Sequence, residues 1–211
     1  MVELPDRGAA TRLLLVRHAE TDESARGTCY GRLDVPLSPE GRRRAEALGA
    51  ALAAFPVAAV YSSPLRRALD TAAALAAPQG LDAVVDDGLR ELDFGELEGL
   101  SYDVIRAERE ELFRRWMERP TDVTFPGGEG FADLRGRVLP AIAAIRARHE
   151  GEAAAVVAHG GVVRVVLADV LELPEGAIFR LGLDFGGITV VDWLDGSAVV
   201  RAVNTVLYSP A

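Results

Sequence analysis

Short β-prone apolar runs alternate with helix-like stretches along most of this 211-residue chain, and this alternation constrains the fold more than any other feature. We expect strands at residues 12–16, 57–61, 83–85, 153–158, 188–193 and 198–203. We expect helices at residues 38–54, 65–77, 101–118, 129–149 and 162–171, the first of them capped by Ser38. The early strands are continuous apolar runs, which is typical of a mostly parallel sheet covered by helices on both faces. The pattern predicts a three-layer α/β/α fold.

Composition limits both the organisation of the chain and its partners. Apolar residues make up 49% of the chain, so we expect one domain over residues 1–211, with residues 1–11 flexible. The net charge of -9 should repel nucleic acid and anionic membranes, and we expect neither as a partner. Composition does not decide whether the protein forms a homodimer. All 23 basic residues are arginines, which excludes lysine Schiff bases and the lysine of a nucleotide-binding P-loop.

Cys29 is the only cysteine, which excludes disulfide frameworks and zinc clusters held by cysteines. The apolar run at residues 13–16 is too short for a signal peptide or a membrane span. We therefore expect a cytoplasmic protein.

The residues that follow three predicted strands are the candidates for chemistry, because ligands of open parallel sheets bind beyond the carboxyl ends of the strands. These residues are Arg17-His18, the run from Ser62 to Arg67, and His159-Gly160-Gly161. We expect them to meet in one pocket. The remaining histidine, His149, lies in the charged run 146–152, and we assign it to a solvated helix end.

Arg17 and His18 together suit phosphoryl transfer, because a neutral imidazole can attack phosphorus while a neighbouring guanidinium holds the phosphoryl oxygens. His159 precedes two glycines and a predicted helix, and the amino end of a helix suits an anion. Each motif alone fits a structural histidine equally well. Arg66 and Arg67 point about 100° apart on their helix, so only one of them should reach the strand ends, and geometry does not choose between them.

Six motifs occur in order along about four-fifths of the chain. They are Leu14 to Thr21 (LLVRHAET), Tyr30-Gly31-Arg32 with Asp34 and Pro36-Leu37, Ser62 to Ala68, Leu89-Arg90-Glu91 with Phe94-Gly95 and Glu98-Gly99, Pro126 to Glu129, and Ala158 to Gly161. Together they resemble the histidine phosphatase superfamily, also called the phosphoglycerate mutase-like family. A single Arg-His pair would be weak evidence for a family, whereas six motifs in the same order identify one.

The resemblance implies that His18 is the residue phosphorylated and that Arg17, Arg67 and His159 hold the phosphate, because the family spacing selects the second arginine of its pair. It implies that Glu91 protonates the leaving alkoxide and then activates the water that hydrolyses phosphohistidine. It implies neither a metal nor a cofactor.

Further candidates for substrate binding are Ser24, Gly31, Arg32 and Gly160. The chain departs from the family pattern at Ala19, where glycine is common, and at Ser24, where mutases in particular have asparagine. Ser24 can still donate a hydrogen bond to a phosphate oxygen.

Two other enzyme classes and a noncatalytic binding module fit these residues less well than a histidine phosphatase does. A metallohydrolase would take its ligands from His18, Glu20, Asp22 and His159. Arg17 beside these residues opposes cation binding. A cysteine phosphatase needs an arginine six residues after its nucleophile, and Val35 stands there relative to Cys29. A noncatalytic binding module on the same fold would have no use for Glu91.

Residues 101–131 are expected to cover the site and to contact the organic part of the substrate, with core packing as the alternative for their aromatic side chains. The segment from Glu91 to Pro126 is shorter than we associate with glycolytic mutases, which favours hydrolysis. The run from Gly127 to Phe131 looks like that of α-ribazole phosphatases, with Gly130 where many relatives have serine. We therefore predict a phosphatase for α-ribazole 5′-phosphate or a broad range of small phosphomonoesters, with mutase-type transfer as the alternative.

Overall fold

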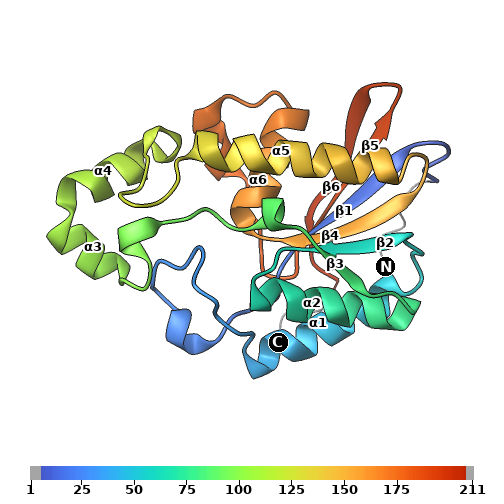
Figure 1. Ribbon diagram of the computed structural model, residues 1–211, viewed down its shortest axis with the longest axis horizontal. Coiled ribbons are helices and arrows are strands. Elements are labelled where there is room, and N and C mark those ends of the chain that lie inside the picture. Colours follow the sequence, from blue (N-terminus) through green and yellow to red (C-terminus); the bar gives the residue numbers. More distant parts are fainter. Residues whose placement is uncertain (1–5, 208–211) are drawn as a thin grey trace.

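A computed structural model describes residues 6–207, and a six-stranded sheet of order β3-β2-β4-β1-β5-β6 forms its middle layer (Figure 1). The strands are β1 (Thr11–Arg17), β2 (Ala59–Ser62), β3 (Ala83–Val85), β4 (Ala153–Ala158), β5 (Ile188–Leu194) and β6 (Ser197–Thr205). Strands β3, β2, β4 and β1 run parallel, and β5 runs antiparallel to both of its neighbours. The predicted fold class is confirmed, and each predicted strand is present with ends shifted by at most two residues.

The helices lie where the sequence predicts them, with one exception. They are α1 (Pro39–Leu52), α2 (Arg66–Ala76), α3 (Tyr102–Glu108), α4 (Glu110–Glu118), α5 (Phe131–Arg148) and α6 (Gly160–Val170). Ser38 caps α1, its Oγ accepting the Gly41 N–H at 2.8 Å. The prediction of a single helix at residues 101–118 is wrong, because the backbone leaves helical geometry at Arg109 (φ -132°, ψ 44°). This break lets Ile105 of α3 and Trp116 of α4 enter the same small core.

Strand β1 shows how a continuous apolar run serves two cores. Leu13 and Leu15 pack in the cluster that includes α5 and α6, while Leu14 and Val16 pack in the cluster that includes α1 and α2. Successive side chains of a strand point to opposite faces, so a strand covered on both sides must be apolar throughout. Figure 1 shows α5 and α6 on one face of the sheet and α1 and α2 on the other.

A third core lies under α3 and α4, beyond the carboxyl ends of the parallel strands (Figure 1). Its side chains include Trp116, Phe125 and Cys29, and Phe125 and Cys29 are each 1% exposed. Phe125 therefore packs in a core, which was the alternative to a contact with the substrate. Burial raises the pKa of the Cys29 thiol to about 12, which leaves it protonated and unreactive.

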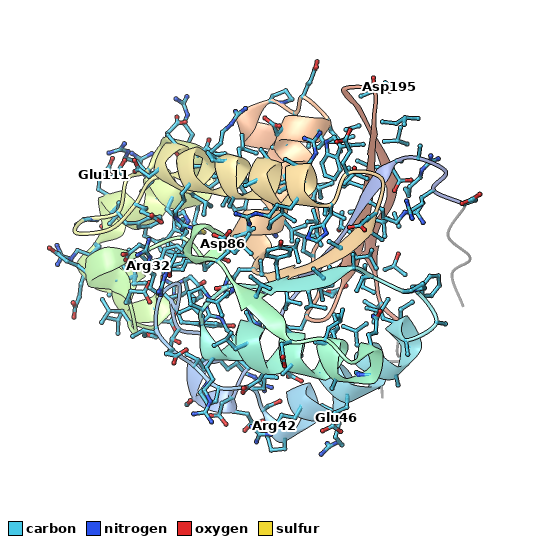
Figure 2. All side chains as sticks on the ribbon, turned by 45° about the vertical axis from the view of Figure 1, so that its right-hand side comes forward. Arg32, Arg42, Glu46, Asp86, Glu111 and Asp195 are labelled. Carbon is cyan, nitrogen blue, oxygen red and sulfur yellow. The ribbon has the colours of Figure 1, made fainter. Side chains whose placement is uncertain are left out.

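Charged side chains spread over the outside of the molecule, as Figure 2 shows for Arg42 and Glu46 on α1. No helix within residues 6–207 is long and apolar enough to cross a bilayer. The predicted flexibility of residues 1–11 concerns in part residues 1–5, which lie outside the described residues. Closer to β1, the Arg7 side chain contacts the carbonyl of Gly151 and Ala10 is buried.

Candidate active site

The carboxyl ends of β1 and β4 bring two of the three histidines together. The strands pair in parallel with Arg17 beside Ala158, so His18 and His159 follow at the same edge of the sheet. Their ring centroids lie 5.2 Å apart, and the two residues are 3% and 0% exposed. The expected meeting of strand ends is therefore observed.

The tautomer of His18 follows from a single contact. Its Nδ1 lies 2.8 Å from the backbone carbonyl oxygen of Ala19, and a carbonyl can only accept, so Nδ1 carries the hydrogen and Nε2 keeps its lone pair. Burial, together with the charges of Arg67 and Arg17, lowers the pKa of His18 well below its ordinary value of 6.5. The ring is therefore neutral at pH 7, as a nitrogen nucleophile must be.

His159 is held by Ser63, which follows β2. Its Nε2 lies 2.8 Å from Ser63 Oγ, and its Nδ1 is buried without a hydrogen-bond partner among the described residues. Burial, then the charge of Arg67, lowers the pKa of His159 well below 6.5. A neutral ring that accepts the Ser63 hydroxyl hydrogen at Nε2 presents Nδ1–H as a donor to a ligand.

Arg67 is the member of the arginine pair that faces the site. It is fully buried at the start of α2 and donates to the carbonyl oxygens of Leu33 (2.7 Å) and Gly31 (2.5 Å). The Arg66 side chain is 63% exposed and lies 3.7 Å from a carboxylate oxygen of Asp70. The rotation of α2 thus decides between the two arginines, a choice that helix geometry alone left open and for which the family spacing pointed to Arg67.

Unsatisfied donors gather beside His18. The Nε atoms of Arg17 and Arg67 and Nδ1 of His159 are buried, and none has a hydrogen-bond partner within the part of the chain that the structure describes. Buried donors are nearly always paired, so this cluster marks where the acceptor oxygens of a ligand belong. The Arg17 guanidinium lies 4.1 Å from the centre of the Phe185 ring, which fixes its orientation.

Glu91 borders the same cluster. Its Oε1 accepts the Leu92 N–H at 2.9 Å and its Oε2 accepts the Gly161 N–H at 3.1 Å. Only glycine allows this approach, because a Cβ on residue 161 would collide with Oε1. Burial lowers the pKa of Arg17 and of Arg67, and the charge of Glu91 opposes that shift in both, which places its carboxylate within their electrostatic reach.

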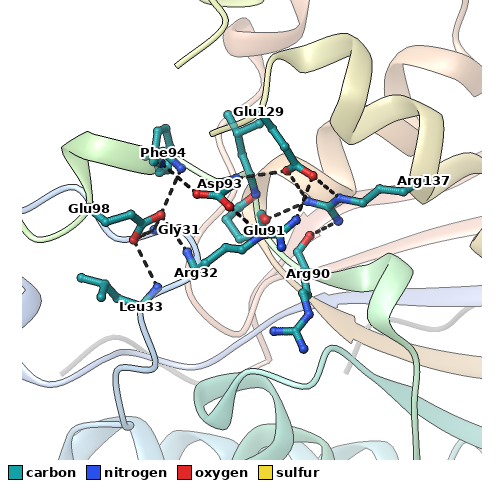
Figure 3. A network of polar contacts seen from close by, with 12 residues as sticks. Gly31, Arg32, Leu33, Arg90, Glu91, Asp93, Phe94, Glu98, Glu129 and Arg137 are labelled. Atoms are coloured by element: carbon teal, nitrogen blue, oxygen red, sulfur yellow. Dashed lines mark hydrogen bonds and ion pairs between the residues drawn. The ribbon is translucent and has the colours of Figure 1, made fainter. Parts of the chain in front are cut away.

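Glu98 holds the loop of residues 31–33 (Figure 3), and the same loop holds the Arg67 side chain. Its carboxylate accepts four backbone N–H groups, those of Gly31, Arg32, Leu33 and Phe94. The carbonyls of the same loop are the acceptors for the Arg67 guanidinium. A half-buried carboxylate that accepts four N–H groups fixes this loop, so Glu98 positions the carbonyl acceptors of Arg67.

Arg137 of α5 does the same for the Glu91 segment (Figure 3). Its guanidinium donates to the backbone carbonyls of Gly88, Arg90 and Glu91 and is paired with the Glu129 carboxylate. The sequence assigned no role to Glu98, although it lies in a family motif, or to Arg137, because the partners of both are backbone atoms of distant segments.

The other predicted residues occupy different places. Arg32 is engaged with Glu129 at 2.8 Å. Gly160 begins α6, and a Cβ there would lie 3.8 Å from Arg17 Nε. Ser24 is exposed in a short turn and donates its N–H to Asp22, so the structure does not gather it with the phosphate cluster. Direct substrate contacts of Gly31, Arg32, Gly160 and Ser24 stay predictions.

The ligand set of the metallohydrolase alternative is not assembled. Over residues 6–207, no group of three or more histidine, cysteine, aspartate and glutamate side chains is placed to hold a metal ion.

A pocket of about 200 Å³ lies next to Glu91, on the side of α3 and α4. Its lining includes Tyr102, Trp116, Phe131, Arg164 and Phe179. The carboxyl group therefore faces space in which an organic group could sit. We call this space the leaving-group pocket.

A sequence profile of the Histidine phosphatase superfamily (branch 1) matches residues 13–206. The chain belongs to this family. Bifunctional protein Rv2228c of Mycobacterium tuberculosis is 40% identical over 204 residues, which are 96% of this chain but 56% of that protein, so the chain spans about half the length of this relative. Phosphoserine phosphatase 1 of Hydrogenobacter thermophilus is 31% identical over 92% of both chains. Probable phosphoglycerate mutase GpmB of Salmonella choleraesuis is 32% identical over 95% of both.

Solved structures of this family have the same fold. The mycobacterial glucosyl-3-phosphoglycerate phosphatase Rv2419c superposes with a TM-score of 0.85 and 30% identity, covering 92% of this chain and 99% of that one. A putative α-ribazole-5′-P phosphatase of Escherichia coli has a TM-score of 0.86 and 27% identity, covering 96% and 100%. The family predicted from the six motifs is thus confirmed.

Proposed function

We propose that this histidine phosphatase superfamily member hydrolyses a small phosphomonoester through a phosphohistidine formed on Nε2 of His18. One observation carries the proposal: the lone pair of a neutral, buried His18 stands beside three unsatisfied donors from Arg17, Arg67 and His159. A nucleophile next to fixed donors is the arrangement that phosphoryl transfer requires.

The first step forms the bond between His18 Nε2 and phosphorus and breaks the bond between phosphorus and the ester oxygen. The phosphoryl oxygens receive hydrogen bonds from Arg17, Arg67 and His159, which stabilise the transition state. Glu91, in its acid form, gives its proton to the departing oxygen.

The second step reverses these roles. Glu91, now a carboxylate, takes a proton from a water molecule whose oxygen attacks phosphorus. The bond between phosphorus and Nε2 breaks, inorganic phosphate leaves, and His18 regains its lone pair. One carboxyl group serves both steps because both are displacements at the same phosphorus.

Hydrolysis is preferred over mutase action because the cover is small. Within residues 6–207, the short helices α3 and α4 and the short segments with Pro120 and Phe179 border the leaving-group pocket on its outer side, and Tyr102 in its lining is 41% exposed. A mutase must exclude water from phosphohistidine until a second hydroxyl accepts the phosphate, and a small cover does this poorly.

α-Ribazole 5′-phosphate is one candidate substrate. The likeness to the E. coli structure and the aromatic walls formed by Tyr102 and Trp116, which could stack on a planar base, support it. Of the sequence run that pointed to it, Phe131 lines the leaving-group pocket, whereas Gly130 is the N-cap residue of α5 and is not among the lining residues in the described chain.

The decisive test uses a phosphomonoester with labelled phosphate, quenched in alkali early in turnover. We expect acid-labile label on His18, none on His149, and free phosphate as the product. Label on another residue, or full activity of His18→Ala, would exclude the mechanism. Rapid conversion of 3-phosphoglycerate to 2-phosphoglycerate with catalytic 2,3-bisphosphoglycerate would identify a mutase, and binding without any turnover would identify a noncatalytic module.

A further inference from the structure

Arg164 enters the leaving-group pocket from α6. It lies three residues after Gly161, whose N–H holds the Glu91 carboxylate, so the two positions share one face of the helix. A Cβ on Gly160 would lie 3.0 Å from Nη1 of Arg164 and 3.8 Å from Nε of Arg17. Arg164 therefore stands next to the phosphate cluster, on the side where the ester oxygen must leave.

The guanidinium of Arg164 is poorly satisfied. Its Nε is buried and has no hydrogen-bond partner among residues 6–207. Its one hydrogen bond to the described chain runs from Nη2 to the Leu181 carbonyl and is long, at 3.3 Å. Burial lowers the pKa of Arg164 and the charge of Glu91 opposes this shift, but the two side chains form no ion pair in the described structure. A charged group in this state has donors left for a ligand.

The surroundings of Arg164 make an anionic partner favourable. Of the described residues that line the pocket, Arg164 and Glu91 alone are charged, and Trp116, Phe131 and Phe179 are among its apolar walls. When Glu91 carries the proton that it must donate, it is neutral, and the pocket then has a net positive charge from Arg164. The Arg164 guanidinium lies 5.3 Å from the centre of the Phe179 ring, and between such apolar walls a carboxylate that accepts two of its N–H groups at once would compensate its charge.

We infer that Arg164 is a specificity-determining residue that binds a carboxylate on the leaving group, within a few bonds of the ester oxygen. This inference rests on the proposed function and adds the class of substrate: phosphorylated hydroxy or amino acids. The leaving group of α-ribazole 5′-phosphate has no carboxylate, so we expect this ester to be a poorer substrate than phosphorylated hydroxy or amino acids.

Two matched pairs of substrates test the inference on the unmodified protein. O-phospho-L-serine differs from O-phosphoethanolamine by its carboxylate, and 3-phosphoglycerate has a carboxylate where glycerol 3-phosphate has a hydroxymethyl group. We expect kcat/KM to be about tenfold or more higher for the carboxylate member of each pair, as a charge-assisted hydrogen bond in a desolvated site implies. Equal values within both pairs would overturn the inference without any variant.

Variants then assign the preference to this residue. Arg164→Met should lower kcat/KM for phosphoserine by about 10- to 100-fold and for phosphoethanolamine by no more than about threefold, while Arg164→Lys keeps part of the preference. Arg180→Met removes an exposed charge on the neighbouring segment and should leave the preference intact. An equal loss on both substrates would mean that Arg164 acts on the phosphate or on Glu91 and would also overturn the inference.

Labelling of His18 separates this inference from the proposed function. If p-nitrophenyl phosphate is hydrolysed with label on His18 but the substrate pairs show no preference, the inference fails alone. If neither turnover nor label is found, the proposed function fails.

Discussion

The phosphate end of the site and its leaving-group end are built differently. At the phosphate end, His18, Arg67 and His159 are at most 3% exposed and are positioned by the central strands and by the start of α2. At the leaving-group end, Tyr102 and Phe179 are 41% and 47% exposed and come from segments outside the sheet. The groups proposed to do the chemistry thus sit on the rigid scaffold, whereas the leaving-group end combines Arg164 of α6 with side chains from peripheral segments.

The largest expected effect is at the phosphate end. Arg67→Met removes a guanidinium that faces the phosphoryl oxygens, so kcat/KM should fall by about 10³-fold or more for every substrate, p-nitrophenyl phosphate included. Arg66→Met is the matched control; because the Arg66 side chain is exposed, this variant should lower kcat/KM by no more than about twofold. Similar losses in the two variants would contradict the assignment.

Glu91→Gln should distinguish the two ends by leaving group. An alkyl phosphate needs a proton on its departing oxygen, so its kcat/KM should fall by about 10²- to 10³-fold, whereas p-nitrophenyl phosphate should lose less than about tenfold because its phenolate leaves unaided. Equal slowing of both substrates in steady-state assays would show that Glu91 is not the acid.

Glu98→Gln should weaken the phosphate end from a distance. Glutamine offers one acceptor oxygen in place of a carboxylate that serves four N–H groups, so the loop that holds Arg67 should loosen and kcat/KM should fall by about tenfold. The loss should be the same for alkyl and p-nitrophenyl esters, because Arg67 acts on the phosphoryl group. Glu96→Gln, at an exposed neighbour, is the control; a leaving-group-dependent loss in Glu98→Gln would argue against a route through Arg67.

Burial of neutral histidines should make the phosphate end sensitive to acid. Because the pKa of His159 is lowered in the folded protein, the unfolded chain gains a proton below pH 6.5 that the folded protein does not, and stability is lost as the pH falls. From pH 7.5 to 5.5 this should cost about 1.4 kcal/mol of unfolding free energy. Urea titrations of the unmodified protein and of His159→Asn at both pH values measure it, and an unchanged pH dependence in the variant would contradict the assignment.

The smallest expected effect is that of metal removal. Arginine and histidine donors provide the charge stabilisation proposed for the phosphate end, so dialysis against EDTA should leave kcat/KM unchanged. Activity that is lost on dialysis and restored by a divalent ion would favour the metallohydrolase alternative.

The prediction from sequence was strongest where the pattern is local. Continuous apolar runs and helix caps located the strands and most helices, because side-chain periodicity and capping depend on neighbours in the chain. It failed at Arg109, where the small core of Ile105 and Trp116 bends the chain and no glycine or proline marks the break.

The sequence by itself determined which residues could do the chemistry: Arg17-His18, Glu91 and His159-Gly160-Gly161 stand out by type and by position after strands or in family motifs. Only the tertiary structure decided how they are oriented. It paired His18 Nδ1 with the Ala19 carbonyl, joined the Glu98 carboxylate to the loop that holds Arg67, and brought Arg164 into the leaving-group pocket. These contacts depend on helix rotation and on backbone atoms far apart in the chain, which residue identity and spacing do not encode.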